Sequence, residues 1–372
     1  MLLLGKKRHT NTFRFLMFFV INIVVLLELM AMMNHPKKKN KIRIADIAAT
    51  AGVSNATVSR VLNGQNIVNA KTYEKVISAM NALGYHHSIS INTLSNKSTL
   101  NDLIILTLPS INNPFYNSVV RGVQSAAQRY GYYTLLYSTD LDGENLNRFI
   151  SLIKDNNVAG VITLNNLTPA ALAKISAATT VVQCCEFCEE SDCSYVSIDD
   201  YQATKTALQH FLDRGRRKIA FINGPMRFKY ARHRQRGYLD FIREHNLEFR
   251  EDWIVQLSDI NFDIALASIT QLLSKDGRPD AVFAVSDIFA SAAIKVAKKI
   301  GLLVPQDLMI IGFDNVDISL MSEPPITTVN QPKMQLGYMA CEVLVERISA
   351  PDAPGKHILL DTELIVRDST MA

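Results

Sequence analysis

Apolar runs and amphipathic stretches alternate through residues 101–372. Short apolar runs between turn residues predict strands, and apolar positions at helical spacing predict amphipathic helices between them. The predicted strands cover 103–108, 134–138, 160–164, 180–184, 195–198, 218–223, 281–285 and 309–313, and the clearest helices cover 115–130, 204–214 and 287–300. This alternation is typical of α/β architecture with parallel sheets, and about 270 residues favour two lobes over a single sheet. Ligands of such sheets bind at the carboxyl ends of the strands.

Residues 41–97 follow a different, helical pattern. A first short helix is expected to end at Gly52, and Ser54 is a suitable N-cap for a second. A third helix is expected over about 70–83, before Gly84. The predicted inward-facing residues are Ile44, Ile47, Ala48 and Ala51 on the first helix, Val58, Val61 and Leu62 on the second, and Val76, Ile77, Met80 and Leu83 on the third. Two short helices joined by a tight glycine turn predict a helix-turn-helix.

The second of these helices has a small, polar outer face. Small side chains let a helix enter the DNA major groove, where Asn and Arg can hydrogen-bond base edges and Arg suits guanine. We therefore expect Asn55 and Arg60 to contact bases. Hydroxyl groups near the helix N-terminus suit phosphates. The residues of this face are Asn55, Ala56, Ser59, Arg60 and Asn63, and the hydroxyl residues expected at phosphates are Ser54, Thr57 and Ser59. The alternative is a solvated polar face on a small helical bundle.

The charge of the chain is unevenly distributed. Residues 34–100 contain nine Lys and Arg residues against two acidic residues, whereas residues 101–372 are acidic overall. A basic segment on an acidic body indicates a polyanionic partner such as nucleic acid. The alternative is a solvated run of charges at the edge of a domain.

The apolar stretch at residues 13–33 has three interpretations. It is long enough to span a bilayer, although Arg14, Asn22 and Glu28 interrupt it. It lacks a clean cleavage site of the kind that follows a secretory signal. Translation from Met33 would instead leave a protein without this extension. We favour the last interpretation and a cytoplasmic protein, and a membrane is expected as a partner only if residues 13–33 are truly present.

No metal, cofactor or catalytic site is predicted. The five cysteines are odd in number, which is typical of reduced thiols, and four of them lie within CCEFCEESDC, Cys184 to Cys193. The pair Cys185 and Cys188 has a metal-like spacing, but no histidine lies nearby and no second such pair follows. The glycine-rich, nucleophile and zinc motifs of common enzyme classes are missing from the places where their chemistry would need them.

The head resembles a known family through the segment IADIAATAGVSNATVSRVLNGQNIVNAKTYEKVISAMNALGY. This segment is similar to the headpiece of the lactose/galactose repressor (LacI/GalR) family of transcriptional regulators. The resemblance implies that the recognition helix starts at Asn55, and that Asn55, Ala56 and Arg60 read bases. It also implies a hinge at 87–100 that becomes helical only on operator DNA. There Leu94 would wedge into the minor groove and kink the duplex.

The body resembles the same family along its whole length, through INNPFYNSVVRGV, NVAGVITL, GRRKIAFINGP, PDAVFAVSD, VPQDLMIIGFDN and PPITTVNQP in the expected order. The resemblance implies two periplasmic-binding-protein-like lobes of type I with a small-molecule effector between them, and a homodimer or higher oligomer. The chain is expected to cross between lobes near Ser197, Thr328 and Lys356. The implied effector contacts are Phe115, Tyr116, Asp199, Arg234, Ile260 and Asp287.

The expected domain boundaries follow from these patterns together. They are an N-terminal extension at 1–33, a helix-turn-helix domain at 41–86, a hinge at 87–100, and an effector-binding and dimerisation domain at 101–372, with lobe 1 at about 101–197 and 328–355 and lobe 2 at about 198–327 and 356–372. The segments GFDNVDISLMSEPPITTVNQP and EFCEESDCSYVSIDD most resemble the nucleoside (cytidine) repressors of the family. A sugar effector is an equally open alternative.

The sequence as a whole predicts an operator-binding transcriptional repressor controlled by a nucleoside or sugar. One rival is an exported or membrane-associated solute-binding protein, which would use the same two lobes but leaves residues 41–97 without a role. A second rival is a nucleoside- or sugar-processing enzyme with Asp199 and Asp287 as an acid/base pair. No nucleophile or metal constellation supports that second alternative.

Overall fold

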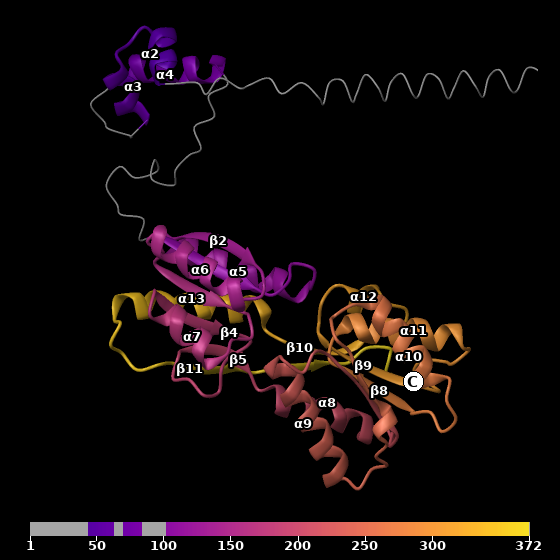
Figure 1. The fold of residues 1–372 in the computed structure, drawn as a ribbon. Coiled ribbons are helices and arrows are strands. Elements are labelled where there is room, and N and C mark those ends of the chain that lie inside the picture. The colour runs from indigo at the N-terminus through magenta and orange to yellow at the C-terminus, as the bar shows by residue number, and fades with distance from the viewer. Residues whose placement is uncertain (1–43, 63–69, 84–101, 372) are drawn as a thin grey trace, which may run out of the picture. The chain divides into compact units, whose positions relative to one another are not determined.

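The computed structural model describes residues 44–62, 70–83 and 102–371 (Figure 1). The chain divides into two compact units, Met1–Asn96 and Lys97–Ala372, which are treated separately below. The first is helical and the second is α/β with two sheets. This confirms the predicted fold class, an all-α headpiece followed by a two-lobed α/β body.

The described part of the headpiece contains the helices α2 (Ile44–Ala51), α3 (Asn55–Leu62) and α4 (Ala70–Leu83). Gly52 has a φ of +65°, in the left-handed region that glycine adopts without strain, and the chain turns there between α2 and α3. The Ser54 Oγ accepts a hydrogen bond from the Thr57 backbone N–H at 3.1 Å, as expected of an N-cap. The buried core consists of Ile47, Ala48, Val58, Val61, Val76, Ala79 and Met80. Ile44 is an exception to the prediction, because it lies at the first position of α2 and is 40% exposed.

The first lobe of the body is built on a six-stranded parallel sheet in the order β11-β5-β4-β3-β1-β2. Its strands are β1 (Leu103–Leu108), β2 (Tyr133–Ser138), β3 (Gly160–Thr163), β4 (Thr180–Cys184), β5 (Tyr195–Ile198) and β11 (His357–Leu360), and its helices are α5 (Phe115–Arg129), α6 (Gly143–Asp155), α7 (Pro169–Ser176) and α13 (Lys333–Ser349). Alternate residues of β1 point to opposite faces. Ile104 and Leu106 join the core shared with α5 and α13, whereas Ile105 joins the core shared with α6 and α7.

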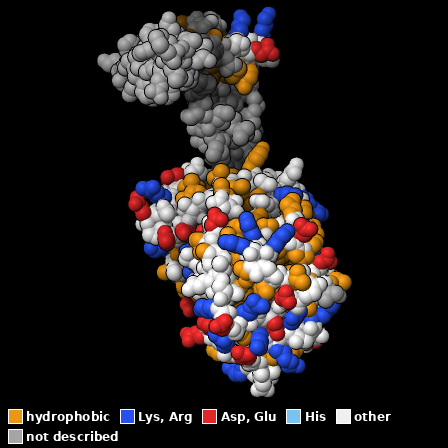
Figure 2. Space-filling view, turned by 90° about the vertical axis from the view of Figure 1, so that its right-hand side faces the viewer, with side chains coloured by type: hydrophobic (Ala, Val, Ile, Leu, Met, Phe, Trp, Pro, Cys, Tyr) orange, Lys and Arg blue, Asp and Glu red, His pale blue; other side chains and the backbone are white. Residues whose placement is uncertain are grey.

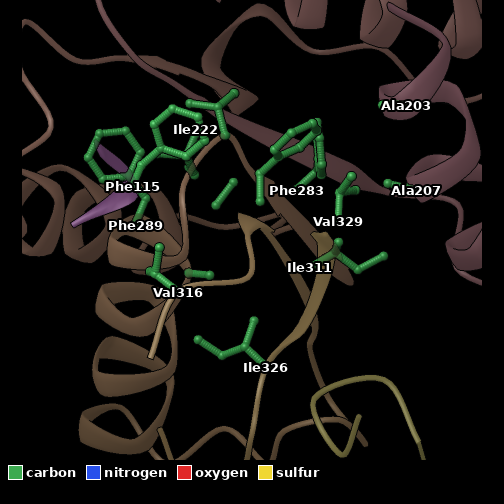
Figure 3. Close-up of a cluster of buried hydrophobic side chains, with 14 of the residues drawn as sticks. Phe115, Ala203, Ala207, Ile222, Phe283, Phe289, Ile311, Val316, Ile326 and Val329 are labelled. Atoms are coloured by element: carbon green, nitrogen blue, oxygen red, sulfur yellow. The ribbon is translucent and has the colours of Figure 1, made fainter. Parts of the chain in front are cut away.

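The second lobe has its own six-stranded sheet in the order β12-β10-β9-β8-β6-β7, in which β12 is antiparallel to β10 and the other pairs are parallel. Helices α8 and α9 lie on one side of this sheet, and α10 and α11 lie on the other (Figure 1). The strands are β6 (Ile219–Asn223), β7 (Ile254–Gln256), β8 (Ala281–Ala284), β9 (Met309–Asp314), β10 (Thr327–Asn330) and β12 (Glu363–Ile365), and the helices are α8 (Asp200–Asp213), α9 (Lys229–Glu244), η2 (Glu251–Trp253), α10 (Phe262–Leu273), α11 (Asp287–Lys299) and α12 (Ile318–Met321). Figure 3 shows part of the core, where side chains of neighbouring strands, Phe283, Ile311 and Val329 among them, lie close together.

The chain crosses between the lobes at three places. It leaves the first sheet after Ile198, returns after Asn330 to form α13, and crosses again after Leu360. The last two crossings lie beyond Thr328 and Lys356, where the sequence analysis expected them. The reason is strand pairing: β10 pairs with β9 as far as Asn330, and β11 pairs with β5 as far as Leu360.

All eight predicted strands are present, and each end agrees to within one residue. The strands that the pattern missed are β7, β10, β11 and β12, each of three or four residues. Within the described ranges, no helix combines the length and apolarity needed to cross a membrane. The apolar stretch at 13–33, the hinge prediction at 87–100 and Leu94 all lie outside the described residues.

Candidate functional site

The outer face of α3 is polar and small, as the sequence predicted. Asn55, Ala56 and Arg60 are exposed, and Ser59 is half-buried. Ser54 is exposed, and its hydroxyl lies 2.8 Å from the hydroxyl of Thr57. These two hydroxyls therefore organise the start of the helix as well as facing outward. The face offers an amide and a guanidinium for hydrogen bonding, with only a methyl group between them.

A cavity lies between the two lobes of the body, at the carboxyl ends of strands from both sheets. Phe115 and Tyr116 start α5 after β1, Glu186 follows β4, Ser286 follows β8 and Asp314 ends β9. The free space is about 40 Å³, which holds a few water molecules at the 10–15 Å³ or so that one water requires. The lining residues are Asn113, Phe115, Tyr116, Cys185, Glu186, Ile198, Asp200, Tyr230, Arg234, Ile260, Val285, Ser286, Asp314 and Gln331.

Four of the six residues expected to contact an effector line this cavity, namely Phe115, Tyr116, Arg234 and Ile260. The other two do not line it. Asp199 is exposed and caps α8, where its carboxylate accepts a hydrogen bond from the Gln202 N–H at 2.9 Å. Asp287 is fully buried, and its carboxyl oxygens accept hydrogen bonds from the Val316 N–H at 2.8 Å and the Thr328 hydroxyl at 2.6 Å.

A buried ion triad lies at the cavity, which two of its members, Asp200 and Arg234, line. Asp200 accepts hydrogen bonds from the Lys229 ammonium at 2.7 Å and the Arg234 guanidinium at 2.8 Å. Arg234 also donates to the Val285 carbonyl at 2.8 Å, and its guanidinium carbon lies 3.4 Å from the centre of the Phe313 ring. Burial by itself would raise the pKa of Asp200, but the two cations hold that pKa below its ordinary value. Asp200 is therefore ionised and Arg234 is fixed in place.

Sequence reasoning singled out Asp199 rather than its neighbour Asp200. The pair SIDD offers two adjacent carboxylates, and only the direction of the side chain at the start of α8 separates them. The signal that could have identified Asp200 is the pair of cations on α9, because a buried carboxylate needs such partners.

The remaining carboxyl groups of the region are held in a low-dielectric environment. Burial raises the pKa of Glu186, although Lys229 opposes that rise. Burial raises the pKa of Asp314 to about 6, against the effects of Arg234 and Lys333. It raises the pKa of Asp287 to about 8, with Asp314 adding to the rise. Burial likewise raises the pKa of Tyr116 and Tyr230, so both phenols are neutral donors at pH 7.

This combination suits a polar ring ligand. Aromatic and aliphatic side chains can pack against the faces of a sugar or base, and fixed carboxylate, amide and guanidinium groups can bond hydroxyl, carbonyl or amine groups. The pair that an enzyme would need is not assembled, because Asp199 is exposed at the start of α8 and Asp287 is buried beneath the cavity lining.

The cysteine cluster lies next to the cavity in the first lobe. The Sγ atoms of Cys184 and Cys185 are 3.6 Å apart, and Cys185 lines the cavity. The Cys193 thiol donates to the Val181 carbonyl at 3.3 Å. Across the parts of the chain that the structure describes, no group of three or more His, Cys, Asp or Glu side chains is arranged to hold a metal ion.

One face of the body has mixed charge, unlike the basic sequence of residues 34–100. On the face shown in Figure 2, Lys and Arg side chains are interspersed with Asp and Glu. A duplex-binding surface is expected to present a basic patch or stripe. This face of the body therefore lacks the basic patch expected of a duplex-binding surface, whereas α3 has the small polar face suited to the major groove.

Comparison with known proteins places both units in one family. The pattern described as "Bacterial regulatory proteins, lacI family" matches residues 43–88, and that described as "Periplasmic binding protein-like domain" matches residues 208–370. The HTH-type transcriptional repressor CytR of Escherichia coli (strain K12) is 31% identical over 343 residues, which cover 91% of this chain and 99% of that protein.

Solved structures agree. The complex of the transcriptional regulator CelR with cellobiose is 31% identical, with a TM-score of 0.67, and the match covers 88% of this chain and all of that one. The lac repressor dimer, bound to operator and the anti-inducer ONPF, is similar in fold at 24% identity, with a TM-score of 0.67 over 89% of this chain and 99% of that one. These relatives are regulators, so an exported solute-binding protein is not favoured. The chain belongs to the lacI family of bacterial transcriptional regulators.

Proposed function

We propose that this regulator is a dimeric, operator-binding repressor whose affinity for DNA is set by a nucleoside or sugar bound between its two lobes. The observation that carries the proposal is the coexistence of a small polar helix face and a polar, aromatic cavity in one chain. CytR, a repressor, is similar over nearly the whole chain. The lac repressor, similar in fold, is a dimer on operator DNA. Operator binding would take place in the cytoplasm.

In this proposal the DNA contacts divide into two classes. Asn55 and Arg60 bond base edges, and the short Ala56 side chain lets the helix approach the groove floor. The hydroxyl side chains proposed to bond phosphates are those of Ser54, Thr57 and Ser59. Leu94 is proposed to enter the minor groove. A dimer would place two such headpieces on a nearly palindromic site.

The effector is proposed to bind between Phe115 and Tyr116 of one lobe and Arg234 and Ile260 of the other. Asp199 and Asp287 would act indirectly, Asp199 by capping α8 and Asp287 by fixing the backbone at Val316. The free space of about 40 Å³ is far smaller than the roughly 300 Å³ or more of typical ligand pockets. The lobes would therefore have to open for the effector to enter. Binding of the effector would in this way change the relative orientation of the two lobes.

The DNA-binding half of the proposal is tested on a site that the full chain selects from a random pool of duplexes. Arg60→Ala is expected to weaken binding to that site by about 1–3 kcal/mol, with little change on unrelated DNA. A competition gel shift at fixed salt measures both affinities. Equal losses on the two DNAs would remove Arg60 from base reading.

The effector half is tested by a thermal-shift screen of nucleosides and sugars against the full chain. A compound that binds only the folded state at a hundred times its Kd should stabilise by about 2.7 kcal/mol. Cellobiose belongs in the panel, because CelR was crystallised with it. A panel in which neither a nucleoside nor a sugar raises the Tm would refute the proposed effector class.

A further inference from the structure

The two lobes are joined across the cavity by a buried carboxylate that caps a helix of the other lobe. Glu186 follows β4 in the first lobe, and α9 begins at Lys229 in the second. The Oε2 atom of Glu186 accepts a hydrogen bond from the Lys229 N–H at 2.6 Å, and the Oε1 atom accepts one from the Tyr230 N–H at 3.2 Å. One carboxylate thus bonds two consecutive backbone donors of the opposite lobe.

The first N–H groups of a helix have no acceptor within the helix itself. Phe228, at the N-cap position of α9, makes no side-chain cap hydrogen bond. Glu186 therefore accepts hydrogen bonds from the first N–H groups of α9, a role that an N-cap residue next to the helix in sequence usually fills. A carboxylate is also favoured at this end of the helix, because the aligned peptide dipoles leave a partial positive charge there.

The side chain of Lys229 strengthens the same junction. Its ammonium donates to the Ser197 hydroxyl, on β5 of the first lobe, at 3.1 Å, and lies 4.5 Å from the centre of the Phe187 ring. Ser197 in turn donates to the Cys185 carbonyl at 2.7 Å. Lys229 is thus bound to the first lobe through both its backbone and its side chain. Lys229 and Ser197 are fully buried, and Glu186 is 5% exposed.

The lobes are also joined by the Lys333 ammonium of α13, which donates to the backbone carbonyls of Asp314 and Asn315, and by two contacts of exposed carboxylates. Glu189 lies 3.1 Å from His233, and Asp140 lies 3.9 Å from Arg227. The side chain of Glu189 is 50% exposed, and both members of the second pair are 54% exposed. Water and salt weaken such contacts, whereas the Glu186 contact is shielded from both.

We propose that Glu186 and Lys229 form an interlobe clamp that stabilises the closed cavity through groups of the chain alone. Opening the lobes must release two charge-assisted hydrogen bonds at the start of α9 together with the Lys229 contact to Ser197. An entering effector must work against this clamp, so the strength of the clamp contributes to how tightly the effector binds and how far it shifts the lobes. The clamp requires neither DNA nor effector, so it stands or falls separately from the proposed function.

Hydrogen exchange of the full chain, followed by mass spectrometry without added ligand or DNA, tests the clamp. The variants are Glu186→Gln and Glu186→Ala, and the matched control is Glu189→Gln, which alters a glutamate three residues away at the same lobe junction. In Glu186→Ala we expect exchange to accelerate about ten- to a hundredfold at Lys229 and Tyr230. We expect an acceleration in the same direction at cavity segments that Glu186 does not contact, around Phe115 and Ser286. Glu186→Gln should produce a smaller acceleration at the same places, and Glu189→Gln should produce none.

Acceleration confined to Lys229 and Tyr230 would overturn the clamp, because it would mean that Glu186 only caps α9. The same conclusion would follow from equal effects in Glu186→Gln and Glu189→Gln. The buried amides of β1 and β6 report whether each variant retains its fold. If Glu186→Ala does not fold, Glu186→Gln decides the question, since it keeps the size of the side chain and one acceptor.

Discussion

The outer face of α3 and the cavity of the body are both polar, but they are built in opposite ways. Asn55 and Arg60 are exposed on a helix whose opposite side holds the headpiece core. In the cavity, Asp200, Lys229 and Arg234 are buried and already bonded to one another. The head therefore gains its interaction energy from a partner, whereas the polar groups of the cavity also hold the fold. Substitutions in the two regions should consequently fail in different assays.

Removal of the shared carboxylate should have the largest effect on stability. Asp200→Ala leaves Lys229 and Arg234 buried without their counter-ion, which should lower the free energy of unfolding by about 3–5 kcal/mol. Urea unfolding can be followed through Trp253, the single Trp of the chain, which is 2% exposed in the second lobe.

The matched control for that experiment is Asp213→Ala, at the exposed end of the same helix. Its effect should stay within about 0.5 kcal/mol. Similar losses of stability in the two aspartate variants would show that the buried triad does not contribute more to the fold than an exposed aspartate does. The stated contrast between the head and the cavity would then be wrong.

The raised pKa of Asp287 predicts that stability falls with rising pH. The folded state holds a proton on Asp287 up to about pH 8. The unfolded chain releases that proton near pH 4, so the folded state binds more protons between these values. Between pH 5 and 7 the contribution of this group should decline by about 1.4 kcal/mol per pH unit. Asp287→Asn should flatten the decline in urea unfolding, and Asp314 should leave a smaller residual slope.

An identical pH slope in Asp287→Asn and in the unsubstituted protein would contradict the buried acid. The histidines do not affect the difference between the two pH slopes, since both proteins carry them. His210 and His233 have lowered pKa values through burial, which makes their contribution run in the opposite direction.

Arg60→Ala should change DNA binding but not the free energy of unfolding, in contrast to substitutions in the cavity. It should weaken binding to the selected operator by about 1–3 kcal/mol while leaving the free energy of unfolding unchanged within about 0.5 kcal/mol. Filter binding and urea unfolding of the same preparation measure the two quantities. A loss of stability comparable to the loss of DNA affinity would mean that Arg60 supports the headpiece rather than reading bases.

Ser54 belongs to the head but is expected to affect both stability and DNA binding. Its hydroxyl caps α3 and also faces outward, so Ser54→Ala should cost about 1 kcal/mol locally and weaken DNA binding by a similar amount. Hydrogen exchange at Thr57 reports the cap. Thr50→Ala is the matched control, because the Thr50 hydroxyl bonds the Asp46 carbonyl within α2 and caps nothing. Unchanged exchange at Thr57 in Ser54→Ala would remove the capping role.

The sequence was most informative where periodicity and burial coincide. The eight predicted strands and the three described headpiece helices follow from apolar patterns that one segment carries by itself. The short strands β10, β11 and β12 are formed by pairing with residues far away in sequence, as between Leu360 and Ile198. Local pattern has no information on such partners, and the last two lobe crossings were accordingly expected a few residues too early, whereas the first lies next to Ser197.

The candidate site divides in the same way. The resemblance correctly placed Phe115, Tyr116, Arg234 and Ile260 together, since all four line one cavity. It singled out Asp199, whereas Asp200 lines the cavity, because the outcome depends on which side chain the start of α8 turns inward. The Glu186 contact could not be predicted from the sequence either, because its partners are backbone N–H groups of a helix in the other lobe.

The central claim is that a ligand in the interlobe cavity controls operator binding. Operator affinity of the full chain, titrated with nucleosides and sugars, tests it most directly when compared with Ile260→Trp, which fills the cavity with a bulky side chain. We predict that one ligand class shifts the affinity of the unsubstituted protein by about 5- to 150-fold, and that Ile260→Trp binds operator without this shift. A full shift that persists in Ile260→Trp, or an affinity that no compound changes, would contradict the account.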